Sequence, residues 1–476
     1  MVPARVWHWI GPSWIGDVQR KVTVQARRRA SAEALLRAQR RRGAAAEVAA
    51  AHVRGGGRGT EVPWERSEYG AGVPCPDGAN QNYSMDRRLK VVIAPDSFKG
   101  SLAADRVAAA LADGWLSARP GDEVVRLPIA DGGEGTLDVF AAAVPGARRR
   151  PLKVTGPDGA PDSRLVDAEW LSLPGGTAVV ELARGSGLPL LGARRDPLGA
   201  HTVGLGQLLA AALDDPATRQ IIVTLGGSAS TDGGTGALAA LGARFLDDAS
   251  APLPPGGGAL SRLAAVDARG LRLAPPGGVL CLTDVDAPLC GPHGAAAVFG
   301  PQKGATPDGI RLLDGGLRRL ATLLGGEPDA PGAGAAGGTG YGLAAAWGAR
   351  LVPGAATVAE HAGLPAALAD ADLVITGEGR FDATSMSGKV VGGVLRLAAA
   401  RVGEAGPVPV LLVAGQLGAP PPPGIDAALA IATLARGVAA ATAEPERWLA
   451  AAAAQLAAAR VDGRRAQDAA RAPEQT

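Results

Sequence analysis

The sequence predicts an α/β fold in which a doubly wound, mainly parallel sheet is interrupted by a second α/β domain. From Lys90 onward, short β-branched runs alternate with Ala- and Leu-rich helical patterns, which is typical of parallel strands joined by crossover helices. The same alternation returns near the C-terminus. Between these regions the strands are shorter, and loops such as 252–258 and 331–340 are rich in Gly and Pro. We therefore expect a first domain split into 85–155 and 366–465, and a second domain spanning 156–365.

The expected elements follow this division. In the first domain they are, in chain order, a strand at 91–94, a helix at 102–117, a strand at 124–129, a helix from about Thr136, a strand at 373–376, a helix near 389–401, and strands at 408–413 and 427–431. In the second domain the clearest strands are 177–182, 221–225 and 278–282.

Residues 1–84 differ in composition from the rest of the chain. They hold two Arg triplets, at 27–29 and 40–42, and a run of three glycines. We expect a basic, disordered extension here; a basic arm for nucleic acid or membrane is the alternative. A further hypothesis is that the natural chain starts at Met85, which opens directly into a strand. The polar tail, 466–476, is expected to fray.

The composition narrows the class of protein. Of the 476 residues, 47% are hydrophobic, and the formal net charge of +2 argues against a dedicated nucleic-acid binder. The three cysteines lack CxxC spacing and are expected to be reduced thiols. No apolar run approaches the length of a transmembrane helix, and no signal-peptide pattern is present. We expect a cytoplasmic protein without a nucleic-acid or membrane partner, and leave monomer and homodimer as alternatives.

The most informative segment is 221–242, IIVTLGGSASTDGGTGALAALG. A β-branched strand stops at two glycines, small hydroxyl residues and further glycines follow, and a helical pattern begins. Backbone N–H groups in such a loop, together with the positive end of a helix, bind anions such as phosphate. The residues expected to contact phosphate are Gly226, Gly227, Ser228, Gly233 and Gly234.

Other strand ends carry loops of similar composition: VVIAPDSFKGS, IADGGEGT, LTDVDAPLCGPHG and VITGEGRFDATSMSGK. Phosphoryl transfer needs a metal ion, cations that neutralise phosphate charge, and a carboxylate that orients the acceptor. The candidates in these loops and after them are Ser97 and Lys99 for phosphate or catalysis, Asp131 and Glu134 for Mg²⁺, Lys303 and Lys389 for phosphate, and Glu378 and Asp382 for metal or base.

Two familiar nucleotide motifs are excluded. The stretch 332–337 matches GxGxxG, but it follows a loop instead of a strand, which argues against a dinucleotide site. The closest approach to a Walker A motif, 387–390, lacks the upstream glycine and the following Ser or Thr. The protein-kinase motifs are also absent. A phosphotransferase with this sequence would therefore be neither a P-loop enzyme with a Walker A motif nor a member of the protein-kinase class.

Six segments occur together in chain order: KVVIAPDSFKGSL, ADGGEGT, LGGSASTDGGTG, DVDAPLCGPHGAAAVFGPQKGA, GAGAAGGTGYG and TGEGRFDATSMSGK. Over about 88–460 they resemble the bacterial glycerate kinase family that is unrelated to Walker-type kinases. The resemblance implies a flavodoxin-like domain interrupted by a second α/β domain, with the active site in the cleft between them. It also implies transfer of the γ-phosphate of ATP to D-glycerate with Mg²⁺, with 2-phosphoglycerate as the favoured product. Departures from the family pattern at 382–385 and 196–206 leave a related hydroxy acid as an alternative acceptor.

The resemblance suggests roles for the charged residues. Asp232 or Asp382 would orient the acceptor hydroxyl. The catalytic Lys99, with Lys303 and Lys389, would neutralise phosphate. Arg184, Arg380 or a lysine would bind the substrate carboxylate. The pool of Mg²⁺ ligands is Asp131, Glu134, Asp284 and Glu378. A phosphatase or dehydrogenase on the same sheet, and a non-catalytic protein that binds a sugar acid, are the alternatives.

Overall fold

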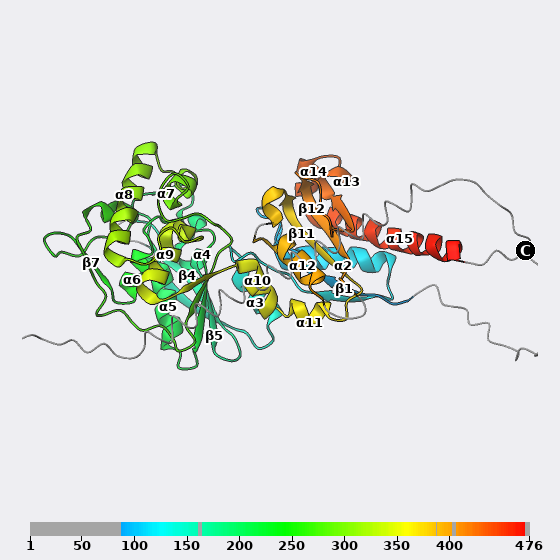
Figure 1. Ribbon diagram of the computed structural model, residues 1–476, viewed down its shortest axis with the longest axis horizontal. Coiled ribbons are helices and arrows are strands. Elements are labelled where there is room, and N and C mark those ends of the chain that lie inside the picture. Colours follow the sequence, from blue (N-terminus) through cyan, green and yellow to red (C-terminus); the bar gives the residue numbers. More distant parts are fainter. Residues whose placement is uncertain (1–86, 160–163, 387, 402–405, 472–476) are drawn as a thin grey trace, which may run out of the picture. The chain divides into compact units, whose positions relative to one another are not determined.

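The computed structural model describes residues 87–159, 164–386, 388–401 and 406–471, with side chains described up to residue 460. The expected extension 1–84 and the hypothesis of a start at Met85 lie outside the described residues. The described residues all belong to one compact unit of the chain. In Figure 1 the blue and cyan segment after residue 87 lies beside the orange and red C-terminal segment, as expected for a domain split by an insertion.

The first sheet has five strands, all parallel. They are β1 (Lys90–Ile93), β2 (Glu123–Arg126), β11 (Leu373–Phe381), β12 (Val410–Leu417) and β13 (Ala427–Ala430). Their spatial order is β13-β12-β11-β1-β2. Counted within this domain, that is the order 2-1-3-4-5 of the flavodoxin-like fold. The predicted doubly wound, mainly parallel fold is confirmed.

Helices cover both faces of this sheet because alternate strand residues point to opposite sides. Val91 and Ile93 pack with helices α2 (Ala104–Ala118) and α15 (Pro445–Arg471). Val92 packs on the other face. The helices of that face are α3 (Thr136–Ala143), α10 (Gly354–His361), α11 (Leu364–Leu368) and α12 (Val390–Ala399). Two short helices, α13 (Ile431–Leu434) and α14 (Val438–Ala443), follow β13.

The second sheet has six strands in the order β10-β9-β6-β5-β4-β3. The strands β5 (Thr177–Glu181), β6 (Gln220–Thr224), β9 (Val279–Leu282) and β10 (Arg350–Val352) are parallel to one another. β4 (Leu165–Ser172) pairs antiparallel with β5 on one side and with β3 (Arg148–Thr155) on the other. Its helices are α4 (Leu182–Ser186), α5 (Val203–Asp214), α6 (Thr235–Ala240), α7 (Ala295–Phe299), α8 (Pro307–Leu324) and α9 (Ala335–Trp347). A small sheet pairs β7 (Arg244–Leu246) with β8 (Ala265–Asp267).

The two main sheets share one hydrophobic core. Val179, Ile222 and Leu280 of the second sheet belong to the same buried cluster as α3, α10 and Val92 of the first sheet. The other face of the second sheet packs with α5, α6, α8 and α9. The carboxyl ends of strands from both sheets are therefore held by a continuous core.

The structure differs from the expected boundaries in two places. Residues 148–155, expected at the end of the first domain, form β3, which pairs only with β4 in the second sheet. This edge strand is polar and mostly exposed from 148 to 151, so it carries no clear core pattern. The tail expected to fray from residue 466 continues as α15 to Arg471.

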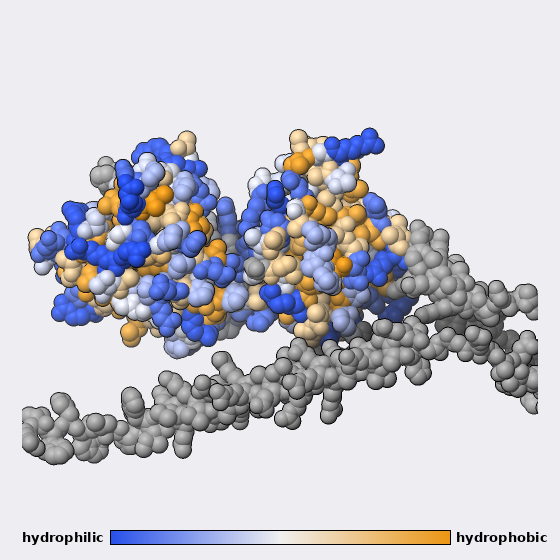
Figure 2. Space-filling view, turned by 45° about the horizontal axis from the view of Figure 1, so that its top comes forward, coloured by the Kyte–Doolittle hydropathy of each residue, from blue (hydrophilic) through white to orange (hydrophobic). Residues whose placement is uncertain are grey.

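The visible face of the molecule mixes hydrophilic and hydrophobic side chains without one continuous apolar area (Figure 2). Among the described residues, no helix is both long enough and apolar enough to cross a membrane.

Candidate active site

Two adjoining cavities lie at the carboxyl ends of the strands. One, of about 400 Å³, lies at the ends of β1, β11 and β12, and we call it the strand-end cavity. The other, of about 800 Å³, is lined also by loops of the second sheet, and we call it the loop cavity. The residues that line both are Ser97, Phe98, Lys99, Gly100, Ser101 and Asp131. The loop between β1 and α2 is therefore the wall that the two cavities share.

This shared wall begins where the pairing of β1 ends. The Asp96 N–H still donates to the Gly377 carbonyl at 2.8 Å, and the chain then turns at Gly100, which has a φ of +81°. Lys99 leaves the turn and forms an ion pair with Asp131, with Nζ 2.7 Å from Oδ2. Asp131 comes from the loop after β2, the parallel neighbour of β1. The order of strands in the sheet thus brings together Lys99 and Asp131, which the sequence analysis predicted as site residues in two separate loops.

Three carboxyl groups around this wall have raised pKa values. Burial, with the nearby Asp131, raises the pKa of Asp96 to about 7 and that of Asp284 to about 7. Burial also raises the pKa of Glu378. Carboxylates whose pKa values are shifted by burial beside a specific charge are typical of functional sites.

Two of these groups offer free oxygens for a cation. Oε1 of Glu378 and Oδ2 of Asp284 are buried and have no hydrogen-bond partner. Within the described ranges, no three acidic, His or Cys side chains converge closely enough to hold a metal ion by themselves. Mg²⁺ is commonly held by one or two carboxylates together with substrate phosphates. The residues present fit that mode of binding, with Asp131 and the exposed Glu134 as further candidates.

The glycine turn after β6 lines the loop cavity through Gly226, Gly227 and Ser228. A Cβ at Gly226 would lie 2.3 Å from the Cα of Gly133, so glycine lets the two loops approach. Lys303 is hydrogen-bonded to the turn: its Nζ donates to Ser228 Oγ at 2.9 Å and to the Ser230 carbonyl. Burial lowers the pKa of Lys303 to about 7. Lys303 also lines the loop cavity. It therefore stabilises the turn and remains a candidate phosphate ligand.

Asp232 does not lie at either cavity. It is fully buried, and its carboxylate accepts hydrogen bonds from the N–H and hydroxyl of Thr202, at 2.9 and 2.7 Å, and from the N–H groups of Gly234 and Gly236. These contacts shape the start of α6. Gly233 and Gly234 also lie outside the cavity walls. In the structure, this part of the motif therefore stabilises the loop before α6 and does not line the two cavities.

Arg184 likewise lines neither cavity. Its guanidinium pairs with Asp138 at 2.5 Å, Glu169 at 3.6 Å and Glu181 at 3.7 Å. Of the two arginines expected at the substrate, only Arg380 lines a cavity, the strand-end one.

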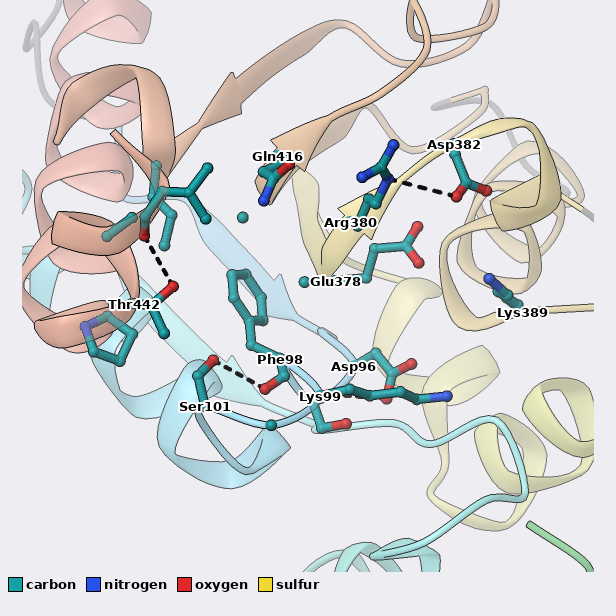
Figure 3. Close-up of a pocket in the computed structure, with 18 of the residues that line it drawn as sticks. Asp96, Phe98, Lys99, Ser101, Glu378, Arg380, Asp382, Lys389, Gln416 and Thr442 are labelled. Carbon is teal, nitrogen blue, oxygen red and sulfur yellow. Dashed lines mark hydrogen bonds and ion pairs between the residues drawn. The ribbon is translucent and has the colours of Figure 1, made fainter. Parts of the chain in front are cut away.

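The end of β11 and the loop after it supply the remaining charged residues of the strand-end cavity (Figure 3). Asp382 accepts hydrogen bonds from the N–H and hydroxyl of Thr384, at 2.9 and 2.7 Å, which lower its pKa. Nζ of Lys389 donates to the Thr384 hydroxyl at 2.8 Å, and Nε of Arg380 lies 3.9 Å from Asp382. Thr384, a departure from the family pattern, thus joins Asp382 to Lys389.

The sequence-based assignment of site residues omitted Asp96 and Gln416, both of which line the strand-end cavity. The position of Asp96 at the end of β1 was a usable signal, because ligands of open α/β sheets bind there. Gln416 lies in the last part of β12, where the sequence shows no distinctive motif.

Known proteins of one family are similar to this chain. The sequence profile of the glycerate kinase family matches residues 91–461. The chain belongs to the glycerate kinase family. It is 44% identical to a glycerate kinase of Bacillus subtilis (strain 168) over 342 residues, 69% of this chain and 85% of that protein. It is 42% identical to a glycerate 2-kinase of Escherichia coli (strain K12), over 72% of this chain and 91% of the relative.

A solved structure shows the same fold. The crystal structure of a protein described as a candidate glycerate kinase 2 from Salmonella typhimurium LT2 superposes with a TM-score of 0.67 at 40% identity. The match covers 80% of this chain and all of that one. Family membership makes the chain an enzyme of the kinase class, as the sequence motifs predicted.

Proposed function

We propose that this kinase transfers the γ-phosphate of ATP to D-glycerate with Mg²⁺, and that 2-phosphoglycerate is the product. The observation that carries the proposal is the pair of adjoining cavities with Lys99 and Asp131 on their shared wall. A two-substrate transfer needs such a meeting point. The names of the relatives, glycerate kinase and glycerate 2-kinase, support the acceptor and the hydroxyl that is phosphorylated.

Each charged group has a task in this proposal. Lys99 neutralises the phosphoryl group as it passes the shared wall, while the N–H groups of Gly226 to Ser228 and Nζ of Lys303 stabilise phosphate oxygens. Asp382 is ionised and exposed to the cavity, so it orients the acceptor hydroxyl in preference to the buried Asp232. Arg380 binds the carboxylate of the acceptor.

Asp284 and Glu378, with their unpartnered oxygens, would hold Mg²⁺, with Asp131 and Glu134 as further ligands. A Mg²⁺ ion held by these carboxylates would supply positive charge that offsets the negative charge of the phosphate oxygens.

The test is to incubate the purified chain with ATP, Mg²⁺ and D-glycerate, and to identify the product by phosphorus NMR. We expect the resonance of 2-phosphoglycerate and equimolar ADP. Formation of 3-phosphoglycerate would contradict the product. ATP hydrolysis without a phosphorylated acid, or turnover only with another hydroxy acid, would contradict the acceptor.

A further inference from the structure

The strand-end cavity has two chemically different ends. One end is charged, with Asp96, Lys99, Glu378, Arg380 and Lys389. We call the other the apolar end, because it is lined by Phe98, Ile431, Val438, Ala441 and Pro445. In Figure 3, Phe98 and Thr442 lie on one side of the cavity, and Lys99, Asp382 and Lys389 lie on the other.

A three-carbon hydroxy acid has no apolar surface to place in the apolar end. Of the two reactants in the proposed function, only the nucleotide carries an aromatic ring system. We propose that the apolar end of the strand-end cavity binds the purine ring of the nucleotide, with the Gln416 amide facing the polar edge of the ring. This inference rests on the proposed ATP-dependent reaction.

The walls of the apolar end suit a flat ring. Phe98 is only 3% exposed, and its backbone is fixed by hydrogen bonds with Leu102 at 2.8 and 3.0 Å. Ile431 is also buried. Val438, by contrast, is 48% exposed at the cavity. Ligand sites are typically lined by apolar and aromatic side chains with a few polar groups, and a bound ring would cover Val438.

Gln416 supplies the polar group. It is half-buried at the end of β12, and its side-chain amide makes no hydrogen bond with any other part of the chain that the structure describes. A carboxamide offers both a donor and an acceptor. The edge of a purine presents both as well, so Gln416 can distinguish one purine from another.

The strand topology also supports a ligand site here. From β1 the chain passes to α2 on one face of the sheet, whereas from β11 it passes to α12 on the other face. β1 and β11 are neighbours, so the crevice between their carboxyl ends is the switch point at which doubly wound sheets bind ligands. The Ser97–Ser101 loop lies between the apolar end and the loop cavity, where it can follow the phosphates.

The experiment compares Val438→Asp with Val298→Asp. Val298, on α7, is 47% exposed and lines neither cavity, so it is a matched control for charge and exposure. ADP affinity is measured by calorimetry, and KM is measured for ATP and for D-glycerate. We expect Val438→Asp to weaken ADP binding at least tenfold, about 1.4 kcal/mol, and to raise the KM for ATP similarly. The KM for D-glycerate and the behaviour of Val298→Asp should stay as in the unmodified chain.

Inorganic tripolyphosphate is a second probe, because it has the charges of the nucleotide but no ring. Its affinity should be the same in Val438→Asp and the unmodified chain. If it weakens as much as ADP does, the new carboxylate acts on the phosphates and the inference is overturned. A higher KM for D-glycerate with unchanged ADP affinity would assign the apolar end to the acceptor, which also overturns it.

Two further outcomes separate this inference from the proposed function. If the unmodified chain binds ADP, and Val438→Asp weakens that binding, the ring site stands even where no glycerate is phosphorylated. If the unmodified chain binds no ADP, the ring site is wrong. Gln416→Ala should reduce the preference for ATP over GTP, measured as the ratio of kcat/KM values, by about three- to tenfold, since one hydrogen bond contributes about 1 kcal/mol.

Discussion

At the scale of single residues, the ion pair between Lys99 and Asp131 connects two loops that follow neighbouring parallel strands. The side chain of Asp131 is only 13% exposed, whereas that of Lys99 is 68% exposed. Lys99 is therefore paired with Asp131 on one side and open to the cavity on the other. This arrangement suits a lysine that binds the phosphate of a substrate.

Replacing Lys99 by Met should lower kcat by about 10²- to 10³-fold, because a charge-neutralising contact in the transition state is lost. Lys153→Met is the matched control. Lys153 pairs with Asp167 at the same 2.7 Å and is 63% exposed, but it lies on β3 away from both cavities. Steady-state kinetics of both variants test the expectation. Equal loss in the two, or no loss in either, would contradict a catalytic place for Lys99.

Asp232 and Asp382 should respond differently to substitution by Asn. Asp382→Asn should reduce kcat and leave the unfolding free energy nearly unchanged, because the side chain is only half-buried and its hydrogen bonds are made within its own loop. Asp232→Asn should lower the unfolding free energy by about 1–3 kcal/mol, since buried N–H donors lose a charged acceptor. Urea unfolding and turnover measured on both variants distinguish the roles. A fully active, destabilised Asp382→Asn would reverse the assignment.

Lys303 should make stability depend on pH in a defined direction. Its folded pKa of about 7 lies below the ordinary 10.5, so between these values the unfolded chain binds a proton that the folded protein does not. Stability conferred by this residue therefore rises with pH from 7 to about 10. The unfolding free energy of the unmodified chain minus that of Lys303→Met should increase over this range. A difference that is constant or falls with pH would show that Lys303 stays fully charged when buried.

At the scale of elements, α2 and α15 pack through a glycine. A Cβ at Gly114 in α2 would lie 2.1 Å from the carbonyl oxygen of Ala450 in α15. Nothing in the local sequence favours Gly inside this helix, where Gly usually costs about 1 kcal/mol relative to Ala. The close approach of the two helices explains it.

Gly114→Ala should therefore destabilise the protein by about 1–3 kcal/mol despite the better helix propensity of Ala, because the backbones must separate. Gly121→Ala is the control, since a Cβ there meets nothing within 4 Å. It should be neutral or slightly stabilising. Chemical denaturation measures both. If Gly114→Ala were as stable as the control, the helices would not be in the close contact described.

At the scale of the whole described molecule, the two sheets share a core through α3 and α10. Phe140 of α3 and Val358 of α10 are buried in the same cluster as Val92 of β1 and Ile222 of β6. Parts joined by a common core are expected to open together.

Hydrogen exchange should therefore give the same free energy of opening for the amides of β1 and of β6, with the same dependence on urea. Mass spectrometry of peptides that cover the two strands provides the measurement. Opening of the second sheet at a lower urea concentration than the first would indicate that the shared core does not couple them.

The sequence by itself determined the alternation of strands and helices, the loops that carry charged groups, and the family. These depend on local periodicity and on short motifs, which can be read along the chain. Strand β3 was not predicted from the sequence, because a polar edge strand lacks the alternation of apolar and polar residues that indicates a strand.

Only the tertiary structure decided which motif residues share a cavity. Asp232 and Asp382 both lie in loops that follow a strand, yet Asp232 is buried and accepts hydrogen bonds from Thr202, whereas Asp382 lines the cavity. Gln416 and Val438 became candidates only because the end of β12 and the start of α14 line the same cavity as the loop after β1. Strand order and burial determine which groups converge, and both arise from packing between segments that are far apart in the chain.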